Sequence, residues 1–283
     1  MKKTTLKEIL QLHEEKKLCG AFFLSNADYH AAPGISKSAL DHIDDSPKFY
    51  KWKLDNPDEL SEALIFGSVY HNIILQDEPF DKLFHITKTQ PRDPVLDEEG
   101  RAPIAERHVE TMAKMRKVFM EHNKASLFLN GLKEVSFFCT DPDTGVLVKT
   151  KADIFLPNGL VVDLKTTTST DKEDVRNTIR ERRYHVQGAF CLDVICNTID
   201  QSGLELKKPD KFVLCFQDKR EKSGIFDIRI GPIGPTSLVL GEKEYKANLA
   251  TYLKCVQENR WPGKSEDDMT ELDLPTWYIQ RYL

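Results

Sequence analysis

The sequence predicts a mixed α/β (α+β) fold, in which a central sheet is flanked by helices and follows a helical N-terminal part. Three patterns support this fold. Apolar residues recur at helical spacing through most of residues 4–122, strand-like runs separated by turn residues follow over 133–167, and helical and strand patterns alternate over 171–259. Because consecutive strands joined by short turns pair antiparallel, the middle stretch should form a three-stranded meander.

The composition fits a folded globular chain of 283 residues, with 40% hydrophobic and 30% charged residues. No internal repeat or low-complexity linker is visible, which favours one domain over 1–283. It would contain a helical N-terminal part (1–60), a core (61–265) and a C-terminal tail (266–283). No apolar run is long enough to span a membrane, and the basic start lacks the apolar segment of a secretory signal.

The charge and the cysteine content limit which classes of function are compatible with the sequence. The six cysteines are scattered without a CxxC pair, which indicates reduced thiols in a cytoplasmic protein and argues against a zinc or iron–sulfur site. The net charge of −5 argues weakly against a general polyanion binder. It is compatible with a nuclease, whose metal site needs acidic residues while a local basic stripe holds phosphates.

The N-terminal part should be helical. We expect an amphipathic helix over 4–18 and a short strand over 22–24. Ser36 fits the N-cap of a helix that runs through Ile43, and Ser46-Pro47 opens another. The apolar side of the first helix should carry Leu6, Ile9 and Leu10.

Residues 61–76 form the most apolar helical segment, in which Gly67 and His71 lie on one face. Because glycine inside a helix costs about 1 kcal/mol relative to alanine, we expect a helix or strand to approach Gly67 closely. His71 is either a hydrogen-bonded core residue or a ligand. The buried side should carry Leu64, Ile65, Ile73 and Ile74.

The next stretch, 77–103, is polar and contains several prolines, so an irregular excursion is expected there. Its part from Pro91 to Arg101 should be the most mobile. A helix over 104–122 follows, with core residues Met112, Met115, Val118 and Phe119.

The densest group of reactive side chains lies in KADIFLPNGLVVDLK (151–165). Two strand-like runs flank the turn cluster Pro157-Asn158-Gly159. A loop centred on the asparagine sets Asp153 directly opposite Asp163, on the same face as Lys165. Carboxylates about 5 Å apart repel each other, and a hard divalent cation such as Mg²⁺ removes that cost. A one-residue slip would send Asp153 to the other face.

An upstream strand over KEVSFFCT (133–140) precedes the hairpin signal DPDTG (141–145). Alternation sets Glu134, Ser136 and Phe138 on one face. From there Glu134 either reaches the carboxylate cluster or stays exposed to solvent.

We expect one long helix over 171–196, begun by Thr170 or Asp171. One face of it would carry Arg176, Arg180, Tyr184, Gln187 and Cys191, with Arg182 and Arg183 adding positive charge. Such a stripe fits a phosphate-backbone path, and a solvated arginine-rich face is the alternative. The same two interpretations apply to the basic and aromatic residues Lys48, Tyr50, Lys51 and Lys53.

The last third should contain a strand pair over 211–217 and 224–230, joined by the basic turn DKREKS (218–223). A helix over 237–259 follows. Trp261 and the aromatic segment LPTWYIQRYL (274–283) should pack back onto the fold.

Asp153 followed by Asp163-Leu164-Lys165 resembles the core motif of the PD-(D/E)xK nuclease superfamily. Further segments occur in a matching order: GISKSALDHI and SPKFYKWK, IFGSVYHNIIL, DLKTT, YHVQGAF and EYKANL. Together they resemble the C-terminal nuclease domain of exonuclease VIII, the RecE-type exonuclease, over roughly residues 30–265. RecE proteins often carry a long further N-terminal region, whereas this sequence begins near the nuclease domain.

The resemblance implies 5′→3′ digestion of double-stranded DNA ends with Mg²⁺, for which Mn²⁺ can substitute. It implies a homo-oligomeric ring, a trimer or tetramer, and a single-strand annealing partner of the RecT type. By motif, Lys165 is the catalytic lysine, and Tyr184 and Gln187 help to order the site and the attacking water. The implied metal ligands are His71, Asp153, Asp163, the Leu164 backbone carbonyl and, more loosely, Glu134. DNA contacts would come from Lys48, Lys51, Arg176, Arg180 and Arg183.

Other functions remain open at this point. A lambda-type exonuclease or an endonuclease of the same fold would share the motif, whereas the scattered cysteines disfavour an iron–sulfur relative. A non-catalytic protein that binds DNA ends would have no need of a metal site with a lysine beside it.

Overall fold

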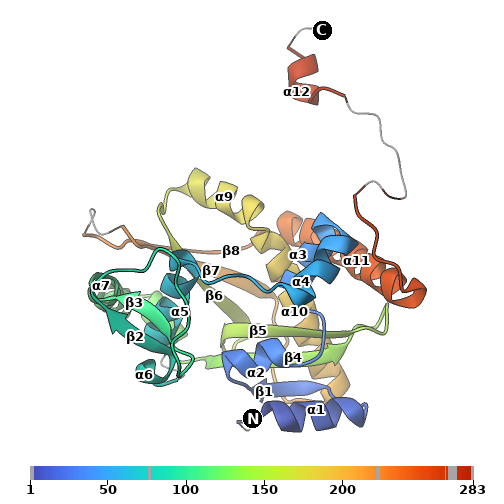
Figure 1. The fold of residues 1–283 in the computed structure, drawn as a ribbon, viewed down its shortest axis with the longest axis horizontal. Helices are drawn as coiled ribbons and strands as arrows, with labels where there is room; N and C mark the ends of the chain where they lie inside the picture. Colours follow the sequence, from blue (N-terminus) through green and yellow to red (C-terminus); the bar gives the residue numbers. More distant parts are fainter. Residues whose placement is uncertain (1–2, 76–77, 221–223, 265, 267–272, 282–283) are drawn as a thin grey trace.

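The computed structural model describes residues 3–75, 78–220, 224–264, 266 and 273–281. Its centre is a six-stranded mixed sheet in the order β1-β4-β5-β6-β7-β8 (Figure 1). All neighbours are antiparallel except β6 and β7, which run parallel. The strands are β1 Gly20–Phe23, β4 Leu132–Thr140, β5 Leu147–Phe155, β6 Leu160–Thr167, β7 Lys211–Asp218 and β8 Ile228–Pro232. The predicted α/β fold class and the β4-β5-β6 meander are confirmed.

Local chemistry accounts for the two turns of the meander. The Asp141 carboxylate accepts the Thr144 backbone N–H at 2.8 Å, which closes the β4–β5 turn. In the β5–β6 turn, Gly159 has φ +84°, a left-handed conformation that favours glycine. A Cβ there would also lie 2.9 Å from the Lys208 carbonyl oxygen. The left-handed glycine therefore shapes the turn locally, and the close approach of Lys208 is a second, long-range reason for glycine at this position.

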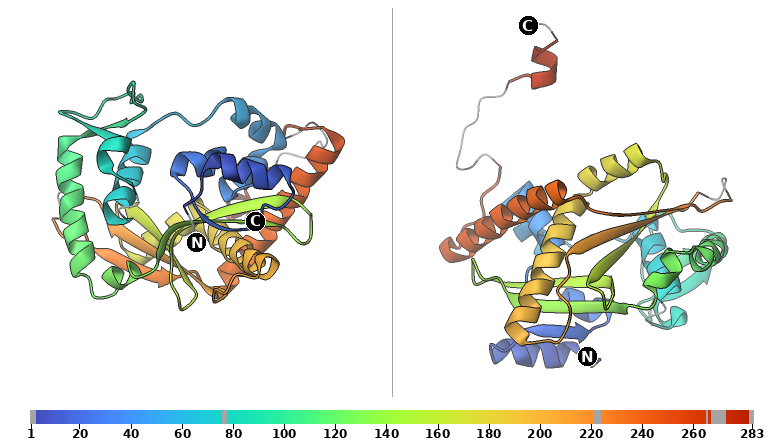
Figure 2. Two further views of the ribbon diagram at one scale, coloured as in Figure 1. Left: turned by 90° about the horizontal axis from the view of Figure 1, so that it is seen from below. Right: turned by 180° about the vertical axis from the view of Figure 1, so that it is seen from behind.

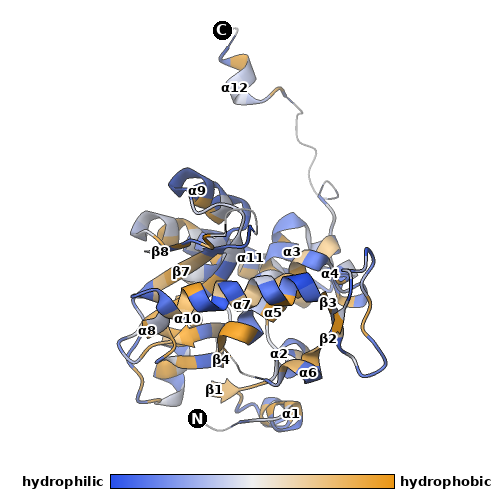
Figure 3. Cartoon of the chain, turned by 90° about the vertical axis from the view of Figure 1, so that its left-hand side faces the viewer, coloured by the Kyte–Doolittle hydropathy of each residue, from blue (hydrophilic) through white to orange (hydrophobic). Residues whose placement is uncertain are grey.

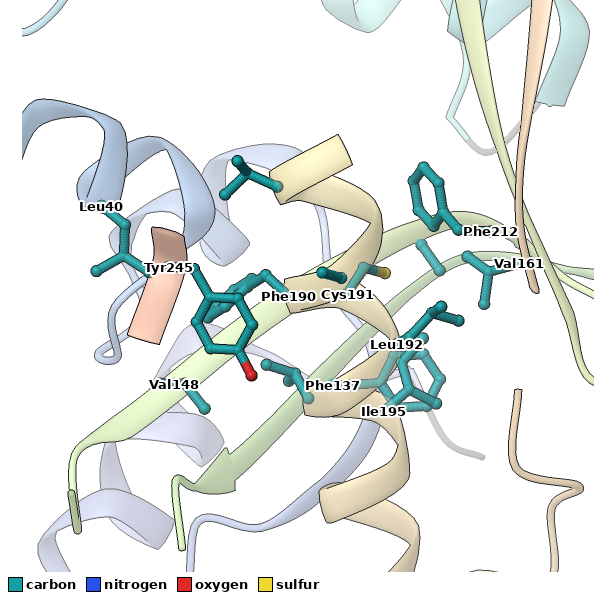
Figure 4. Close-up of a cluster of buried hydrophobic side chains, with 14 of the residues drawn as sticks. Leu40, Phe137, Val148, Val161, Phe190, Cys191, Leu192, Ile195, Phe212 and Tyr245 are labelled. Atoms are coloured by element: carbon teal, nitrogen blue, oxygen red, sulfur yellow. The ribbon is translucent and has the colours of Figure 1, made fainter. Parts of the chain in front are cut away.

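One face of the sheet is covered by α10 (Tyr184–Ser202) and α11 (Pro235–Glu258). Figure 2 shows α10 crossing the strands when the fold is viewed from behind. Phe190, Cys191 and Ile195 of α10 pack among strand residues such as Phe137 (Figure 4). Helices α3 (Lys37–Asp45) and α4 (Pro47–Asp55) extend this layer, and the predicted caps Ser36 and Ser46 are confirmed.

Two separate groups of helices cover the other face. Helices α5 (Glu62–Leu75) and α7 (Glu106–Glu121) enclose a core with β6, β7 and β8. Helices α1 (Leu6–Glu14) and α2 (Asn26–Ala31) pack near β1 and β4 around Phe138. In Figure 3 the strands are mostly hydrophobic, and hydrophilic residues gather along α9 (Lys172–Glu181). The remaining short elements are α6 Phe80–Leu83, β2 Phe84–Thr87, β3 Ala102–Ala105, α8 Ala125–Phe128 and α12 Thr276–Ile279.

Several predicted elements were wrong. The helix expected over 171–196 is two helices, α9 and α10, because Arg183 between them adopts the left-handed conformation (φ 53°). The stretch expected to be irregular contains the parallel pair β2–β3. Within it, Asp97 accepts the backbone N–H groups of Glu99 and Arg101, which defines a turn.

Smaller differences concern positions of individual residues. Leu10 and Leu64, both predicted to be buried, are exposed. Strand β8 begins four residues later than predicted, and residues 221–223 of the predicted turn lie outside the described part. Trp261 does pack against Tyr50 and Tyr252, whereas Trp277 is 68% exposed. The six cysteines are free thiols, and no described helix is long and apolar enough to cross a membrane.

Candidate active site

The site lies where β5 and β6 separate. These strands pair at Ile154↔Val162 and Phe155↔Val161, whereas β6 pairs with β7 along its whole length. The register, continued by one residue, sets Asp153 across from Asp163, as a loop centred on Asn158 predicts. Here a side chain replaces the backbone hydrogen bond between the strands: the Asp153 carboxylate accepts the Leu164 backbone N–H at 2.7 Å. The separated strands leave room for side-chain chemistry inside the sheet.

Asp163 is held by groups on both sides. Lys165 Nζ lies 2.7 Å from its Oδ2, and Gln187 Nε2 donates to its Oδ1 at 2.6 Å. The Lys165 ammonium also lies 4.8 Å from the centre of the Tyr184 ring. Tyr184 and Gln187 come from the first turn of α10, so this helix fixes the aspartate–lysine pair.

A second group of ligand-type side chains lies beside the first. His71 on α5, Glu134 on β4 and Asp153 on β5 each offer one atom within 4.8 Å of the others. His71 Nδ1 is 3.6 Å from Asp153 Oδ2, and its Nε2 is 2.9 Å from the Leu164 carbonyl oxygen. When Nε2 donates to that carbonyl, Nδ1 keeps the lone pair that a metal would need.

Glu134 reaches the cluster through an unusual backbone conformation. Its φ of 55° lies in the left-handed region, which a non-glycine residue adopts at a cost of about 1–3 kcal/mol. Its Oε2 lies 2.6 Å from Lys151 Nζ, and that ammonium also donates to Asn26 Oδ1 on α2. Sequence reasoning missed Lys151 as a site residue. The signal was the alternation along β5, which sets Lys149, Lys151 and Asp153 on one face.

The donor set fits one hard divalent ion. Asp163 is already bound to Lys165 and Gln187, and the Leu164 carbonyl to His71. A nitrogen of His71 and carboxylate oxygens of Glu134 and Asp153 are the ligand-type atoms that lie together among the described residues. The structure thus brings Glu134 together with His71 and Asp153, while Asp163 engages Lys165 and Gln187 and the Leu164 carbonyl engages His71.

Electrostatics favour a cation at this place. Burial raises the pKa of Asp153 to about 7, and Asp163 and Glu134 add to the rise while His71 and Lys165 oppose it. Burial alone would lower the pKa of Lys165, but the carboxylates of Asp163 and Asp153 outweigh it and raise that pKa. The negative charge of the carboxylates is therefore not fully balanced by nearby cations. Lys165 is protonated at neutral pH.

The cluster opens into a pocket of about 700 Å³ between α2, α5 and the strands, lined by Asn26, His30, His71, Glu134, Asp153 and Lys165. Gly67 also lines this pocket. A Cβ built on Gly67 meets no atom within 4 Å, so the prediction that another element approaches it closely was wrong. The open space there belongs to the mouth of the site.

The predicted DNA-binding residues lie elsewhere, and some are already paired. Arg183 contacts Asp41, Asp44 and Glu244, so it joins α3 and α11 to the start of α10. Arg176 and Arg180 are exposed on α9, beyond the helix break, which separates them from Tyr184 and Gln187. On α4, Lys48 pairs with Glu266, and Lys51 lies over the Trp261 ring.

Comparisons with known proteins agree with this fold and site. Residues 36–269 match a family described as "PDDEXK-like domain of unknown function (DUF3799)". No curated protein is significantly similar to the chain. A crystal structure from Eubacterium rectale, described as a "Putative exonuclease", matches with a TM-score of 0.59 and 17% identity, over 88% of this chain and 94% of that one. At this identity the likeness shows a shared fold. The family match spans most of the sequence, and the chain therefore belongs to this PDDEXK-like family and has the PD-(D/E)xK nuclease fold.

Proposed function

We propose that this protein is a metal-dependent exonuclease that acts on the ends of linear double-stranded DNA. One observation carries the proposal: partly buried carboxylates, a protonated lysine and a histidine together line an open pocket. Three carboxylates, of Asp153, Asp163 and Glu134, face the two ammonium groups of Lys165 and Lys151, so a further bound cation would stabilise the cluster, as a metal-dependent nuclease requires.

The side chains can divide the work of phosphodiester hydrolysis. His71, Glu134 and Asp153 would hold Mg²⁺, or Mn²⁺, which tolerates a histidine ligand better. Such an ion supplies Lewis-acid activation and lowers the pKa of bound water. Lys165, whose pKa is raised, places a positive charge beside the phosphate and orients the attacking water rather than removing its proton. Tyr184 and Gln187 keep Lys165 and Asp163 in position.

Within this class of enzymes we propose a RecE-type exonuclease. The order of the motifs from Ser36 to the YHVQ segment supports this type. On this proposal the enzyme digests 5′→3′ and leaves a 3′ single-stranded overhang for recombination by strand annealing. A trimeric or tetrameric ring around the duplex and a RecT-type annealing partner belong to the same proposal, as does a cytoplasmic location.

The test is digestion of a linear duplex labelled separately at its 5′ and 3′ termini, with Mg²⁺ or EDTA, beside a closed circle. We expect Mg²⁺-dependent release from the 5′ ends and an intact circle. Lys165→Ala should lower the rate by roughly 10²–10³-fold, the cost typical of removing one transition-state charge contact, and should keep DNA affinity.

Other outcomes identify the alternatives. Cutting of the circle would indicate an endonuclease of the same fold. End binding without cleavage in either Mg²⁺ or Mn²⁺ would contradict catalysis, and cleavage by Lys165→Ala at the wild-type rate would contradict the role of the lysine.

A further inference from the structure

A second pocket, of about 740 Å³, lies next to the candidate active site. Ala63 on α5 lines both pockets, and β6 runs from Lys165 and Thr166 in the first pocket toward Thr168 in the second. A chain molecule whose phosphate occupies the first pocket could therefore continue directly into the second. No side chain of this second pocket takes part in the chemistry proposed above.

Positive charge surrounds this second pocket. Arg107 from the first turn of α7 and Lys219 and Arg220 after β7 line it, against the single carboxylate of Glu62. Glu62 is engaged by His108 Nε2 at 2.8 Å and by Arg107 at 3.8 Å, and Asp218 pairs with Arg220. Among the described residues no carboxylate pairs with Lys219, whose ammonium lies 5.3 Å from the centre of the Phe66 ring. The rim thus has a cation available for an anion.

The inner wall of the pocket is apolar and aromatic. Phe66 and Ala63 line it, and the His108 ring meets Phe66 edge-on, with centroids 5.4 Å apart. His108 is 9% exposed, and its Nδ1 is buried without a hydrogen-bond partner. An aromatic wall and a cationic rim are complementary to a nucleotide, with its base inside and its phosphate outside.

We propose that this pocket is a subsite for a nucleotide of the same DNA strand, next to the one whose phosphate lies at the metal site. The proposal rests on the proposed function, since it is the strand that connects the two pockets. Lys219 and Arg107 contact its phosphate, and Phe66 and His108 contact its base. The subsite holds the strand by its backbone and by one base, without selecting a sequence.

Binding of a fluorescent single-stranded thymidine 12-mer, measured by polarisation in Ca²⁺ at several salt concentrations, tests the subsite. Lys219→Ala and Arg107→Ala should each weaken binding by roughly 5–20-fold, the loss expected for one charge-assisted contact. Each should also lower the salt slope by about 0.7, the share of one phosphate contact on a single strand. Phe66→Leu should weaken binding and leave the slope unchanged. Lys243→Ala, an exposed lysine on α11, is the matched control and should bind as wild type.

The outcomes separate the subsite from the proposed function. Wild-type binding by both Lys219→Ala and Arg107→Ala, or no binding by the wild type, overturns the subsite even if the enzyme cleaves DNA. The expected losses without any cleavage by the wild type would support the subsite and contradict the nuclease. If the variants lose affinity only for thymidine 5′-monophosphate and not for the 12-mer, the pocket binds a free nucleotide and the strand subsite is overturned. Unchanged Mn²⁺ affinity and thermal unfolding in each variant show that the losses arise at the pocket.

Discussion

At the scale of single residues, Asp153 lowers the stability of the metal-free protein when it is ionised, although a metal ion would require its ionised form. Its carboxylate is only 14% exposed and faces Asp163 and Glu134, so its charged form is disfavoured without a cation. The folded pKa of about 7 lies above the ordinary value of 3.8. Between these values the folded state binds more protons than the unfolded state, so this group's stabilising contribution is complete below about pH 4 and is lost as the pH rises through 7.

Asp153→Asn should therefore stabilise the metal-free protein at pH 8, by roughly 2–4 kcal/mol as an upper range, because a neutral amide avoids the buried charge. The amide oxygen can still accept the Leu164 N–H. Thermal unfolding in EDTA should show the full gain at pH 8, a smaller gain at pH 5 and almost none below pH 4. A variant less stable than wild type at pH 8 in EDTA would contradict the assigned pKa.

The same protonation predicts how metal binding depends on pH. Since a divalent ion needs the ionised carboxylate, Mn²⁺ affinity should rise by about tenfold per pH unit below 7 and level off above it. Calorimetry in buffers of different ionisation enthalpy measures the proton released with each ion. Binding that is independent of pH between 5.5 and 7 would show that Asp153 is already ionised.

Lys151 would compete with the proposed metal ion for Glu134. Lys151→Met keeps the length of the side chain and removes the cation 2.6 Å from Glu134 Oε2. We expect Mn²⁺ to bind about tenfold more tightly, a change of roughly 1.4 kcal/mol, and the protein to be less stable in EDTA, because a buried carboxylate is left unpaired. Lys211→Met, at an exposed position of β7, is the control. Weaker Mn²⁺ binding by Lys151→Met would mean that the lysine instead holds Glu134 in its ligating position.

At the scale of elements, two helical glycines provide opposite tests of packing. A Cβ at Gly241 in α11 would lie 2.4 Å from the His185 carbonyl oxygen of α10, whereas a Cβ at Gly67 in α5 meets nothing. Gly241→Ala should thus cost about 1–3 kcal/mol or more by forcing two core helices apart. Gly67→Ala should stabilise by up to about 1 kcal/mol through helix propensity.

Urea unfolding of both variants measures the difference, and equal effects would contradict the packing described here. Gly67→Ala has a second readout, because this residue lines the mouth of the metal pocket. A more stable but slower enzyme would show that substrate uses the space that the glycine leaves open.

The elements that sequence patterns predicted well depend on local chemistry. The capped helices after Ser36 and Ser46 and the turns at Asp141 and Gly159 need only residues within a few positions of each other. The break between α9 and α10 depends on distant residues, since Arg183 is held left-handed with Asp41, Asp44 and Glu244 as its partners. The parallel β2–β3 pair likewise joins segments that no short pattern connects.

In the candidate site, too, local patterns placed some residues correctly and failed to place others. Alternation and one turn place Asp153, Asp163 and Lys165 together, and the spacing within one helical turn places Tyr184 beside Gln187. The Glu134–Lys151 pair could be missed because it needs a left-handed glutamate inside a strand, which no propensity predicts. Leu64 was misplaced for a related reason: an apolar residue at the rim of a functional pocket has the same pattern as one in the core.

At the scale of the whole molecule, the net charge of −5 opposes association with DNA. If the chain forms the proposed ring, enclosure rather than attraction keeps the enzyme on its substrate. Raising the salt concentration should then slow the capture of ends, because it screens the local cations, and leave the length digested per encounter nearly unchanged.

Adding excess unlabelled duplex after digestion has begun, at low and at high salt, measures that length on a gel. A duplex closed by hairpins offers no end and serves as the control, and sedimentation under the same conditions should give a trimer or tetramer. A digested length that shortens in proportion to capture would mean that charge contacts hold the enzyme on DNA, and the ring would have to be abandoned.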